Sequence, residues 1–309
     1  MLTVECRTPD DILRVFADRG RDFNGVNVAT ALHRVATLGK KMKVDKHDPR
    51  LEKLVHLAAD RVDSLDTVGL VNCLWGVAKI GGLRSRFSLF DAVAEVVPSK
   101  LNEFNAQKLS NVAWAYATAS IQAPQLYDAI ALDSRRKIDS FSPQALSNMA
   151  WAYATAGIVD TDLFQAIAVA VPKNIHGFKP QELANVAWGF AKAGVEAPLL
   201  FEAVGDQAVT TASKFDSQEL SNIVWAFATA GASHPGLFEA VAWVAVKHAH
   251  HFNAQEMANT VWAFSTAGVG DVPLYDSVAN EAVKCIANFN SQGLANMVWA
   301  FAKAGVSAP

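Results

Sequence analysis

One pattern of apolar and polar positions recurs along most of the chain. Each copy begins with Phe and a capping-type residue, continues through Gln and Leu to an Asn, and then reaches a Trp followed by Ala and an aromatic residue. Six copies are nearly identical, of which residues 141–157 and 215–231 are examples. The apolar residues of each copy recur at helical spacing, so each copy predicts an amphipathic helix.

The tryptophans give the period of this pattern. Seven of the eight fall at Trp75, Trp114, Trp151, Trp188, Trp225, Trp262 and Trp299, separated by 39 residues once and by 37 residues five times, and Trp243 alone lies outside this register. Residues 65–81 form a weaker copy, and residues 23–39 a still weaker one with His33 in place of Trp. A fixed period of this length is the signature of a repeat protein, and we count eight units.

Each unit is predicted to contain two helices. The second helix has a capping residue nine positions before Trp and ends at a Gly, which suits the left-handed conformation at a helix C-terminus. The capping residues are Asn105, Ser142, Asp216, Asn253 and Asn290, and the terminal glycines are Gly157, Gly194, Gly231, Gly268 and Gly305. The first helix begins near a Pro, at Pro124, Pro198, Pro235 or Pro273.

A single pair of such helices cannot bury its apolar faces, so neighbouring pairs must stack. The sequence therefore predicts an all-α fold, an α-solenoid of about eight two-helix repeats of about 37 residues. Residues 1–63 are expected to hold a divergent N-terminal repeat and the first helix of the next, and residues 64–309 the regular array. The last repeat ends at Pro309 without a polar capping helix, so we expect the array to be truncated at its C-terminus.

Composition narrows the class of protein further. Hydrophobic residues make up 51% of the 309 residues and charged residues 18%, which excludes a disordered chain. The net charge is −3, and residues 64–309 hold 15 Lys plus Arg against 20 Asp plus Glu, so no strongly basic field indicates nucleic acid. Cys6, Cys73 and Cys285 lie far apart, which predicts a reducing compartment and neither a disulfide framework nor a zinc site.

No membrane or targeting segment is predicted. The longest uncharged runs, residues 109–127 and 220–238, are each interrupted by a turn sequence, so they are interpreted as two short helices and not as membrane spans. Residues 1–21 contain four acidic residues and no apolar run, which is unlike an organellar transit peptide or a secretory signal.

One narrow polar line is predicted on each second helix. With about 100° per residue, the positions seven and three before Trp and four after it fall within about 40° of one another. The line carries Gln, Asn and Thr or Lys, among them Gln144, Asn148, Gln181, Asn185, Lys192, Asn222, Asn259, Asn296 and Lys303. In one interpretation the Asn side chains bond a neighbouring repeat and hold the stack, since a buried amide without a partner costs about 1 to 3 kcal/mol. In the other, the line contacts phosphate or sugar of a bound strand, because an invariant line cannot distinguish bases.

The tryptophans have two interpretations as well. We expect them to pack in the core with the Leu, Val and Phe or Tyr columns of the same helix, on both of its sides. The alternative is a surface on which bases stack.

Cations recur at the end of the first helix, fourteen or fifteen residues before Trp: Lys100, Arg136, Lys137, Lys173, Lys247, His248 and Lys284. One explanation is the favourable interaction of cations with a helix C-terminus. The other is a row of positive charges, one per repeat, that follows a phosphate backbone.

Other positions vary between repeats. They lie six, eleven, twelve and fourteen residues before Trp. Variation at such positions is what a protein that contacts one base per repeat requires, although a solvated surface varies between repeats as well. The group His248, His250 and His251 has no acid or Cys beside it and is predicted not to bind a metal. No nucleophile and base pair, phosphate loop or carboxylate pair recurs, so we expect no enzymatic activity and no cofactor.

The recurring segment, such as LSNVAWAYATA at residues 109–119, resembles the octotricopeptide and heptatricopeptide repeat proteins. It is also similar to the helical arrays that precede RAP domains in FAST-kinase-like proteins and to a helical subunit of the RNA-editing substrate-binding complex. The resemblance implies a single-stranded RNA-binding protein of mitochondria or plastids, acting in RNA processing, stability, editing or translation, with protein partners in a ribonucleoprotein complex. The alternative is a protein-binding scaffold of armadillo type without RNA contact.

Overall fold

The computed structural model describes residues 6–306, and in this part of the chain the secondary structure consists of α-helices and short 3-10 turns without any strand. The helices alternate between two roles, as the sequence predicts. The first helices of the eight repeats are α1 (Pro9–Arg19), α3 (Pro49–Asp60), α5 (Arg86–Val96), α7 (Pro124–Arg136), α9 (Thr161–Lys173), α11 (Pro198–Thr211), α13 (Pro235–His248) and α15 (Val272–Lys284). The second helices are α2 (Gly25–Leu38), α4 (Thr67–Ile80), α6 (Ala106–Ala119), α8 (Pro143–Ala156), α10 (Pro180–Ala193), α12 (Ser217–Ala230), α14 (Ala254–Ala267) and α16 (Ser291–Ala304).

The ends of the helices follow the predicted signals. Asp216 and Asn253 accept a hydrogen bond from the backbone N–H groups of Glu219 and Glu256, whose carboxylates in turn accept from the backbone N–H of the cap. The terminal glycines adopt positive φ, for example +72° at Gly268. These contacts satisfy backbone groups that a helix end otherwise leaves without partners.

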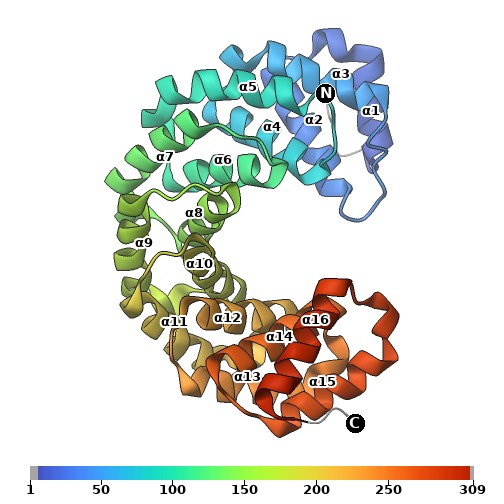
Figure 1. Ribbon diagram of the computed structural model, residues 1–309. Helices are drawn as coiled ribbons and strands as arrows, with labels where there is room; N and C mark the ends of the chain where they lie inside the picture. Colours follow the sequence, from blue (N-terminus) through green and yellow to red (C-terminus); the bar gives the residue numbers. More distant parts are fainter. Residues whose placement is uncertain (1–5, 307–309) are drawn as a thin grey trace. The chain divides into compact units, whose positions relative to one another are not determined.

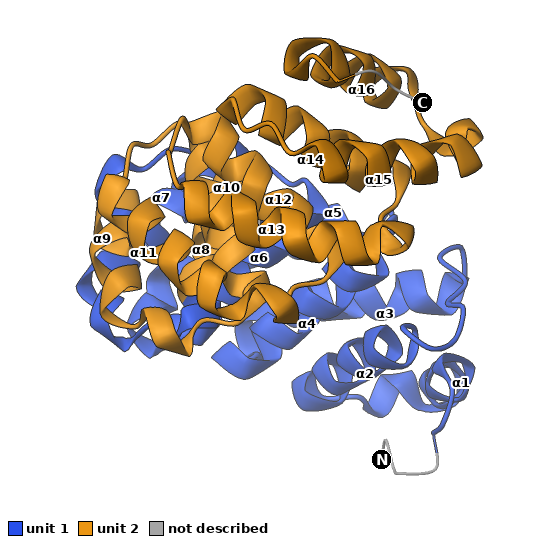
Figure 2. Ribbon diagram, turned by 90° about the horizontal axis from the view of Figure 1, so that it is seen from below, with its two compact units in different colours: residues 1–145, 155–163 blue, residues 146–154, 164–309 orange. Residues whose placement is uncertain are grey.

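The chain divides into two compact units, residues 1–145 with 155–163 and residues 146–154 with 164–309 (Figure 2). In the first unit the second helices α2, α4 and α6 pack side by side, and the first helices α3 and α5 pack on one another (Figure 1). In the second unit α10, α12, α14 and α16 form the same kind of layer, and α11, α13 and α15 form the other. Each unit is thus a stack of helical hairpins, and the predicted α-solenoid is confirmed.

Aromatic pairs join the two helices of a repeat. Phe201 of α11 meets Phe227 of α12 with ring centroids 5.1 Å apart and planes at 88°. Equivalent edge-to-face pairs join Phe90 to Tyr116, Phe164 to Phe190, Phe238 to Phe264 and Tyr275 to Phe301. Such pairs contribute about 0.5 to 1.5 kcal/mol beyond the burial of their area, so each hairpin has its own fixed contact.

Buried tyrosines join one repeat to the next. Tyr127 of α7 donates a hydrogen bond to the carbonyl oxygen of Ala113 in α6 at 3.0 Å, and Tyr275 of α15 donates to the carbonyl oxygen of Val261 in α14 at 3.3 Å. Burial raises the pKa of both phenols, so both stay protonated donors. In the described part of the chain, none of the helices combines the length and the apolar character that a membrane crossing requires.

Candidate nucleic-acid interface

The predicted polar line lies on the solvent-facing side of the second helices. Its Gln and Lys members Gln144, Gln181, Lys192 and Lys303 are exposed, and its Asn members Asn148, Asn185, Asn222, Asn259 and Asn296 are half-buried. The Leu, Val and Phe or Tyr columns of the same helices are buried, for example Leu183, Val186 and Phe190 of α10. The second helix therefore separates an apolar side in the core from one narrow polar side.

The tryptophans lie on the same side as the polar line, and the expectation of a buried Trp column is wrong. Each Trp of the column is half-buried, except Trp299, which is 44% exposed. Trp188 and Trp225 lie with ring centroids 6.3 Å apart and planes at 31°, and Trp262 and Trp299 repeat this arrangement at 6.5 Å. On the helix, Trp lies within about 60° of the polar line, so it points to the solvent-facing side. Part of each ring packs on neighbouring side chains, and the remaining part is exposed to solvent. We call the Gln, Asn, Trp and Thr or Lys side chains of the second helices the amide–indole face.

The Asn side chains do not hold the stack by hydrogen bonds. Within residues 6–306, the side-chain amides of Asn185, Asn222, Asn259 and Asn296 make no hydrogen bond with another group of the chain. Other side chains make hydrogen bonds between repeats, among them Tyr127, Tyr275 and Lys137. The amides are therefore available to a ligand.

Lysines lie over some of these indoles. The Nζ atom of Lys79 is 4.7 Å from the ring centroid of Trp114, and that of Lys303 is 4.7 Å from the ring of Trp299. Lys79 occupies the same position after Trp75 as Lys303 does after Trp299, although its repeat is a weak copy in which the polar line is hard to recognise. The position of Lys79, four residues after Trp75, is the sequence feature that identifies it as a member of the polar line.

The cations at the end of the first helix separate into two groups. Lys100 and Lys137, fourteen residues before Trp, turn back to the preceding repeat. Lys137 Nζ donates to the carbonyl oxygens of Leu101 and Phe104 at 3.1 and 2.8 Å and pairs with Asp133 at 2.6 Å. Lys100 Nζ reaches the carbonyl oxygens of Asp63 and Leu65 in the same way, at 3.4 and 3.3 Å. These two lysines satisfy turn carbonyls and are not free to follow a strand.

The second group is exposed: Arg136, Lys173, Lys247, His248 and Lys284. Lys284 pairs with Glu281 at 2.7 Å, and Lys247 lies 3.1 Å above the ring of the exposed Trp243. The His248 ring stacks on His251 with centroids 6.0 Å apart. The described residues contain no cluster of three potential metal ligands.

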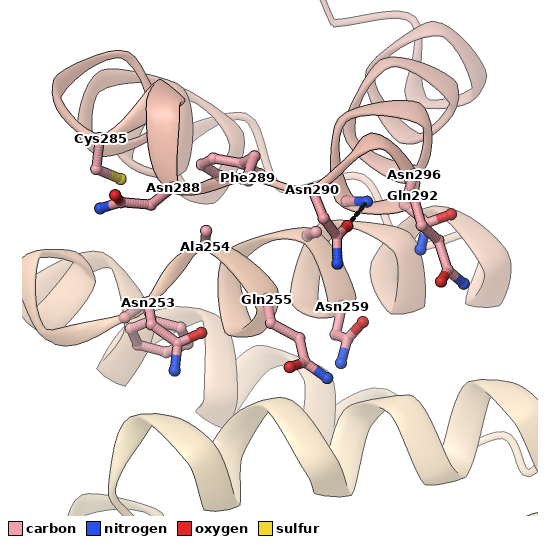
Figure 3. Close-up of a pocket in the computed structure, with 13 residues that line it drawn as sticks. Asn253, Ala254, Gln255, Asn259, Cys285, Asn288, Phe289, Asn290, Gln292 and Asn296 are labelled. Carbon is pink, nitrogen blue, oxygen red and sulfur yellow. Dashed lines mark hydrogen bonds between the residues drawn. The ribbon is translucent and has the colours of Figure 1, made fainter.

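Variable and invariant positions meet in a groove between α14 and α16 (Figure 3). The groove has a volume of about 540 Å³. Gln255, Asn259, Gln292 and Asn296 from the amide–indole face line it, together with three residues from the variable columns, Cys285, Asn288 and Gly293. The sequence-predicted variable columns at six, eleven and fourteen residues before Trp thus converge on one junction between repeats.

The residue six before Trp differs between this junction and that of α4 and α6. At the junction of α4 and α6 this residue is Lys108, whose Nζ donates to Thr67 Oγ1 at 2.6 Å across the space. Between α14 and α16 it is Gly293, where an added Cβ would lie 3.3 Å from Asn290 Oδ1 and 3.9 Å from Ala258 Cβ. The missing side chain leaves the groove lined by amides.

Comparison with known proteins places these features in context. Residues 82–230 and 132–308 match, in two overlapping stretches, the profile of the family described as RNA-editing substrate-binding complex 6 protein. The chain is also similar to a chloroplastic RAP domain-containing protein of Oryza sativa subsp. japonica, 31% identical over 139 residues that make up 40% of this chain. The matched part is 22% of that protein, so the chain spans only a minor part of its length.

Proposed function

Because this chain belongs to the family of the RNA-editing substrate-binding complex 6 protein, we propose that it binds single-stranded RNA along the amide–indole face of its second helices. The role is one of binding, within RNA processing, editing or stabilisation in an organelle, and not of catalysis. The family description supports RNA and protein partners, and the chloroplastic name of the rice relative supports an organelle, with mitochondrion and plastid both compatible.

The observation that carries the proposal is the state of the Asn column. A half-buried amide with no partner in the chain keeps one acceptor and two donors available to a ligand. The repeated amides beside half-buried indoles supply what a single strand requires, which is polar contact to phosphate and sugar together with aromatic surface for bases. The Gln and Asn contacts are the same in the six regular repeats, so they orient the strand without selecting a sequence.

Selectivity is assigned to the variable columns. The groove between α14 and α16 is lined by Asn288 and Cys285 beside the invariant amides, and the corresponding junction between α4 and α6 is bridged by Lys108. Different polar groups at different junctions give each repeat its own preference for a base edge. This division of roles is that of an octotricopeptide- or heptatricopeptide-type array, and we propose that class for the chain.

A second candidate function is supported by the other layer. The first helices of the second unit carry exposed apolar side chains, with Leu199 74%, Val169 61% and Trp243 60% exposed. Apolar side chains on a surface of few charges suit a protein partner. A protein-binding scaffold is the alternative function, and it uses a different surface from the one proposed for RNA.

The test compares two pairs of substitutions. Asn185→Leu with Asn222→Leu removes two amides from the amide–indole face, whereas Gln165→Leu with Asn280→Leu removes two exposed amides from the first helices α9 and α15. We expect the first pair to weaken binding of a uniform single-stranded RNA about a hundredfold, since each of the two hydrogen bonds to a charged group that is removed costs about 1.5 kcal/mol, or close to a factor of ten.

The protein with the second pair is expected to bind RNA like the unaltered chain. The free energies of unfolding of both variants should lie within about 0.5 kcal/mol of that of the unaltered chain. Fluorescence anisotropy at low salt measures the affinity. Equal affinity for all three proteins contradicts the interface, and no binding by the unaltered chain moves the assignment to the protein scaffold.

A further inference from the structure

A basic pocket of about 850 Å³ lies at the C-terminal ends of α2 and α4, in the first unit. Its positive groups are Lys40, Lys43, Lys46 and Lys79, with His47 beside them, and Asp45 is the one carboxylate that lines it. Lys79, four residues after Trp75, also belongs to the amide–indole face, whereas Lys40, Lys43 and Lys46 lie outside the repeat pattern. The pocket therefore needs its own explanation.

An inserted loop supplies most of this charge. Residues 39–48 join α2 to the next first helix, whereas residues 194–197 make the equivalent connection after α10. The longer connection carries four lysines in eight residues, Lys40–His47, in a chain whose net charge is −3. The connections after α6, α8, α10, α12 and α14 contain no lysine or arginine, so this concentration of charge is local to one junction.

The lysines of the pocket have no carboxylate partner among the described residues. In the described part of the chain, none of Lys40, Lys43, Lys46 and Lys79 forms an ion pair, and Asp45 instead accepts a hydrogen bond from the backbone N–H of His47 at 2.9 Å. Lys46 packs over the turn that follows α4, where a Cβ on Gly82 would lie 3.5 Å from its Cδ. The pocket keeps uncompensated positive charge.

The helix ends account for only part of this clustering. Each helix C-terminus carries a partial charge of about −0.5, so α2 and α4 together offset about one lysine. Four lysines and one aspartate leave a surplus beyond that. Partial burial, together with the charge of Lys40, lowers the pKa of Lys79, which is the electrostatic cost of placing these groups side by side.

The pocket is continuous with the amide–indole face of the same unit. Lys40 Nζ lies 5.7 Å from the ring centroid of Trp75, and Lys79 Nζ lies 4.7 Å from that of Trp114, while both lysines also line the pocket. A strand that stacks or packs on these two indoles therefore passes the lysines directly.

We propose that this pocket binds the terminal phosphate of a single-stranded RNA that lies along the amide–indole face of the first unit. The inference rests on the proposed RNA function and adds to it an anchor for one end of the strand. A terminal phosphate monoester carries a charge of about −1.5 to −2 near neutral pH, whereas each internal phosphate carries about −1. A pocket with several unpaired lysines around one space matches the doubly charged group better than a single backbone phosphate.

The experiment measures the affinity of the full chain for one single-stranded RNA sequence with a 5′-phosphate, with a 3′-phosphate, and with hydroxyl groups at both ends. We expect the unaltered chain to prefer one phosphorylated form about tenfold over the hydroxyl form, from charge-assisted hydrogen bonds to the added group. Lys43→Gln with Lys46→Gln should abolish that preference and keep the affinity for the hydroxyl form within about twofold.

The control variant is Lys41→Gln with Lys53→Gln, which removes two exposed lysines of the same region that do not line the pocket. It should retain the preference. Binding of all three RNAs with equal affinity overturns the anchor and leaves the proposed function intact, whereas binding of none of them at low salt rejects the proposed function itself. If inorganic tripolyphosphate binds the pocket but an end phosphate on RNA adds no affinity, the pocket is a site for free anions and the proposal is wrong.

Discussion

Tyr127 and Tyr275 show how one side chain specifies the junction between two repeats. Each phenol is buried and donates a hydrogen bond to a backbone carbonyl oxygen of the preceding second helix. Asn185 of α10 and Asn222 of α12 lie instead on the solvent-facing side of the second helices, where they are half-buried and make no hydrogen bond with another described residue. The buried phenols thus contribute to stability, whereas the half-buried amides stay available for binding.

At the residue scale we therefore predict opposite effects for the two columns. Tyr127→Phe should lower the free energy of unfolding by about 1 kcal/mol, because it removes a buried hydrogen bond and leaves the ring packed. RNA affinity should stay unchanged. Thermal and urea denaturation check the stability, and a Tyr127→Phe protein that melts like the unaltered chain would show that the bond across this junction contributes nothing.

Among the helices, α6 and α14 differ in the residue that ends them. Both second helices end in the left-handed region, at Ser120 with φ +54° and at Gly268 with φ +72°. A residue with a Cβ is strained there, by about 1 to 2 kcal/mol, and no other group lies within 4 Å of a Cβ built on Gly268. The cost of a side chain at this position is thus one of backbone conformation alone.

We predict that Ser120→Gly raises the free energy of unfolding by up to about 1 kcal/mol and that Gly268→Ala lowers it by about 1 kcal/mol. The two substitutions at equivalent positions act as controls for one another, and differential scanning calorimetry measures both. Changes of the same sign would contradict the assignment of the strain to the left-handed conformation.

The cations at the C-terminal ends of the first helices are expected to have two different roles. Lys137 binds carbonyl oxygens of the preceding repeat, so Lys137→Gln should lower stability by about 1 to 2 kcal/mol. The exposed cations Arg136, Lys173, Lys247 and Lys284 should affect RNA binding instead. Changed together to Gln, they are expected to flatten the dependence of log K on log salt by about 0.7 for each phosphate that is no longer neutralised.

Titration of RNA binding between low and moderate salt measures that slope. The Lys137→Gln protein serves as the control, because it removes one charge of the same region but is expected to leave the slope unchanged. If the fourfold variant keeps the original slope, the exposed cations do not contact the strand.

For the whole molecule, the repeat sets the length of the bound RNA. Removal of residues 194–267 takes out two whole repeats of the second unit, α11 to α14. Helix α10 is then followed by α15 and α16, and it can pack on α16 as α14 does in the unaltered chain. If each repeat contacts one nucleotide, the eight repeats protect about eight nucleotides and the shortened chain about two fewer.

Nuclease protection on a uniform single strand measures both footprints. Duplex RNA should be bound poorly, because its bases are paired and its grooves do not offer them to the second helices. An equal footprint for the two proteins would show that RNA contacts only part of the array.

Local signals in the sequence determined the elements of this fold. The Trp spacing gives the period, the capping residues and terminal glycines give the ends of the second helices, and the structure confirms helices at these positions. The α-solenoid follows because an amphipathic hairpin can bury its apolar side only against another hairpin of the same kind. The candidate residues of the polar line were also found from the sequence, since the helical period alone places Gln, Asn and Lys on one side.

Tertiary structure alone decided which polar and aromatic side chains are free. The helical period places Trp225 next to the polar line, but only the packing of neighbouring helices shows that its ring is half-buried beside Trp188. Lys137 and Lys284 belong to one sequence feature, yet one binds carbonyl oxygens of the preceding repeat and the other faces solvent. The basic pocket joins loop 39–48 to Lys79 across two repeats. Sequence periodicity describes one helix at a time, whereas partner, burial and charge environment depend on the neighbouring repeat, whose distance and orientation arise only when the hairpins pack.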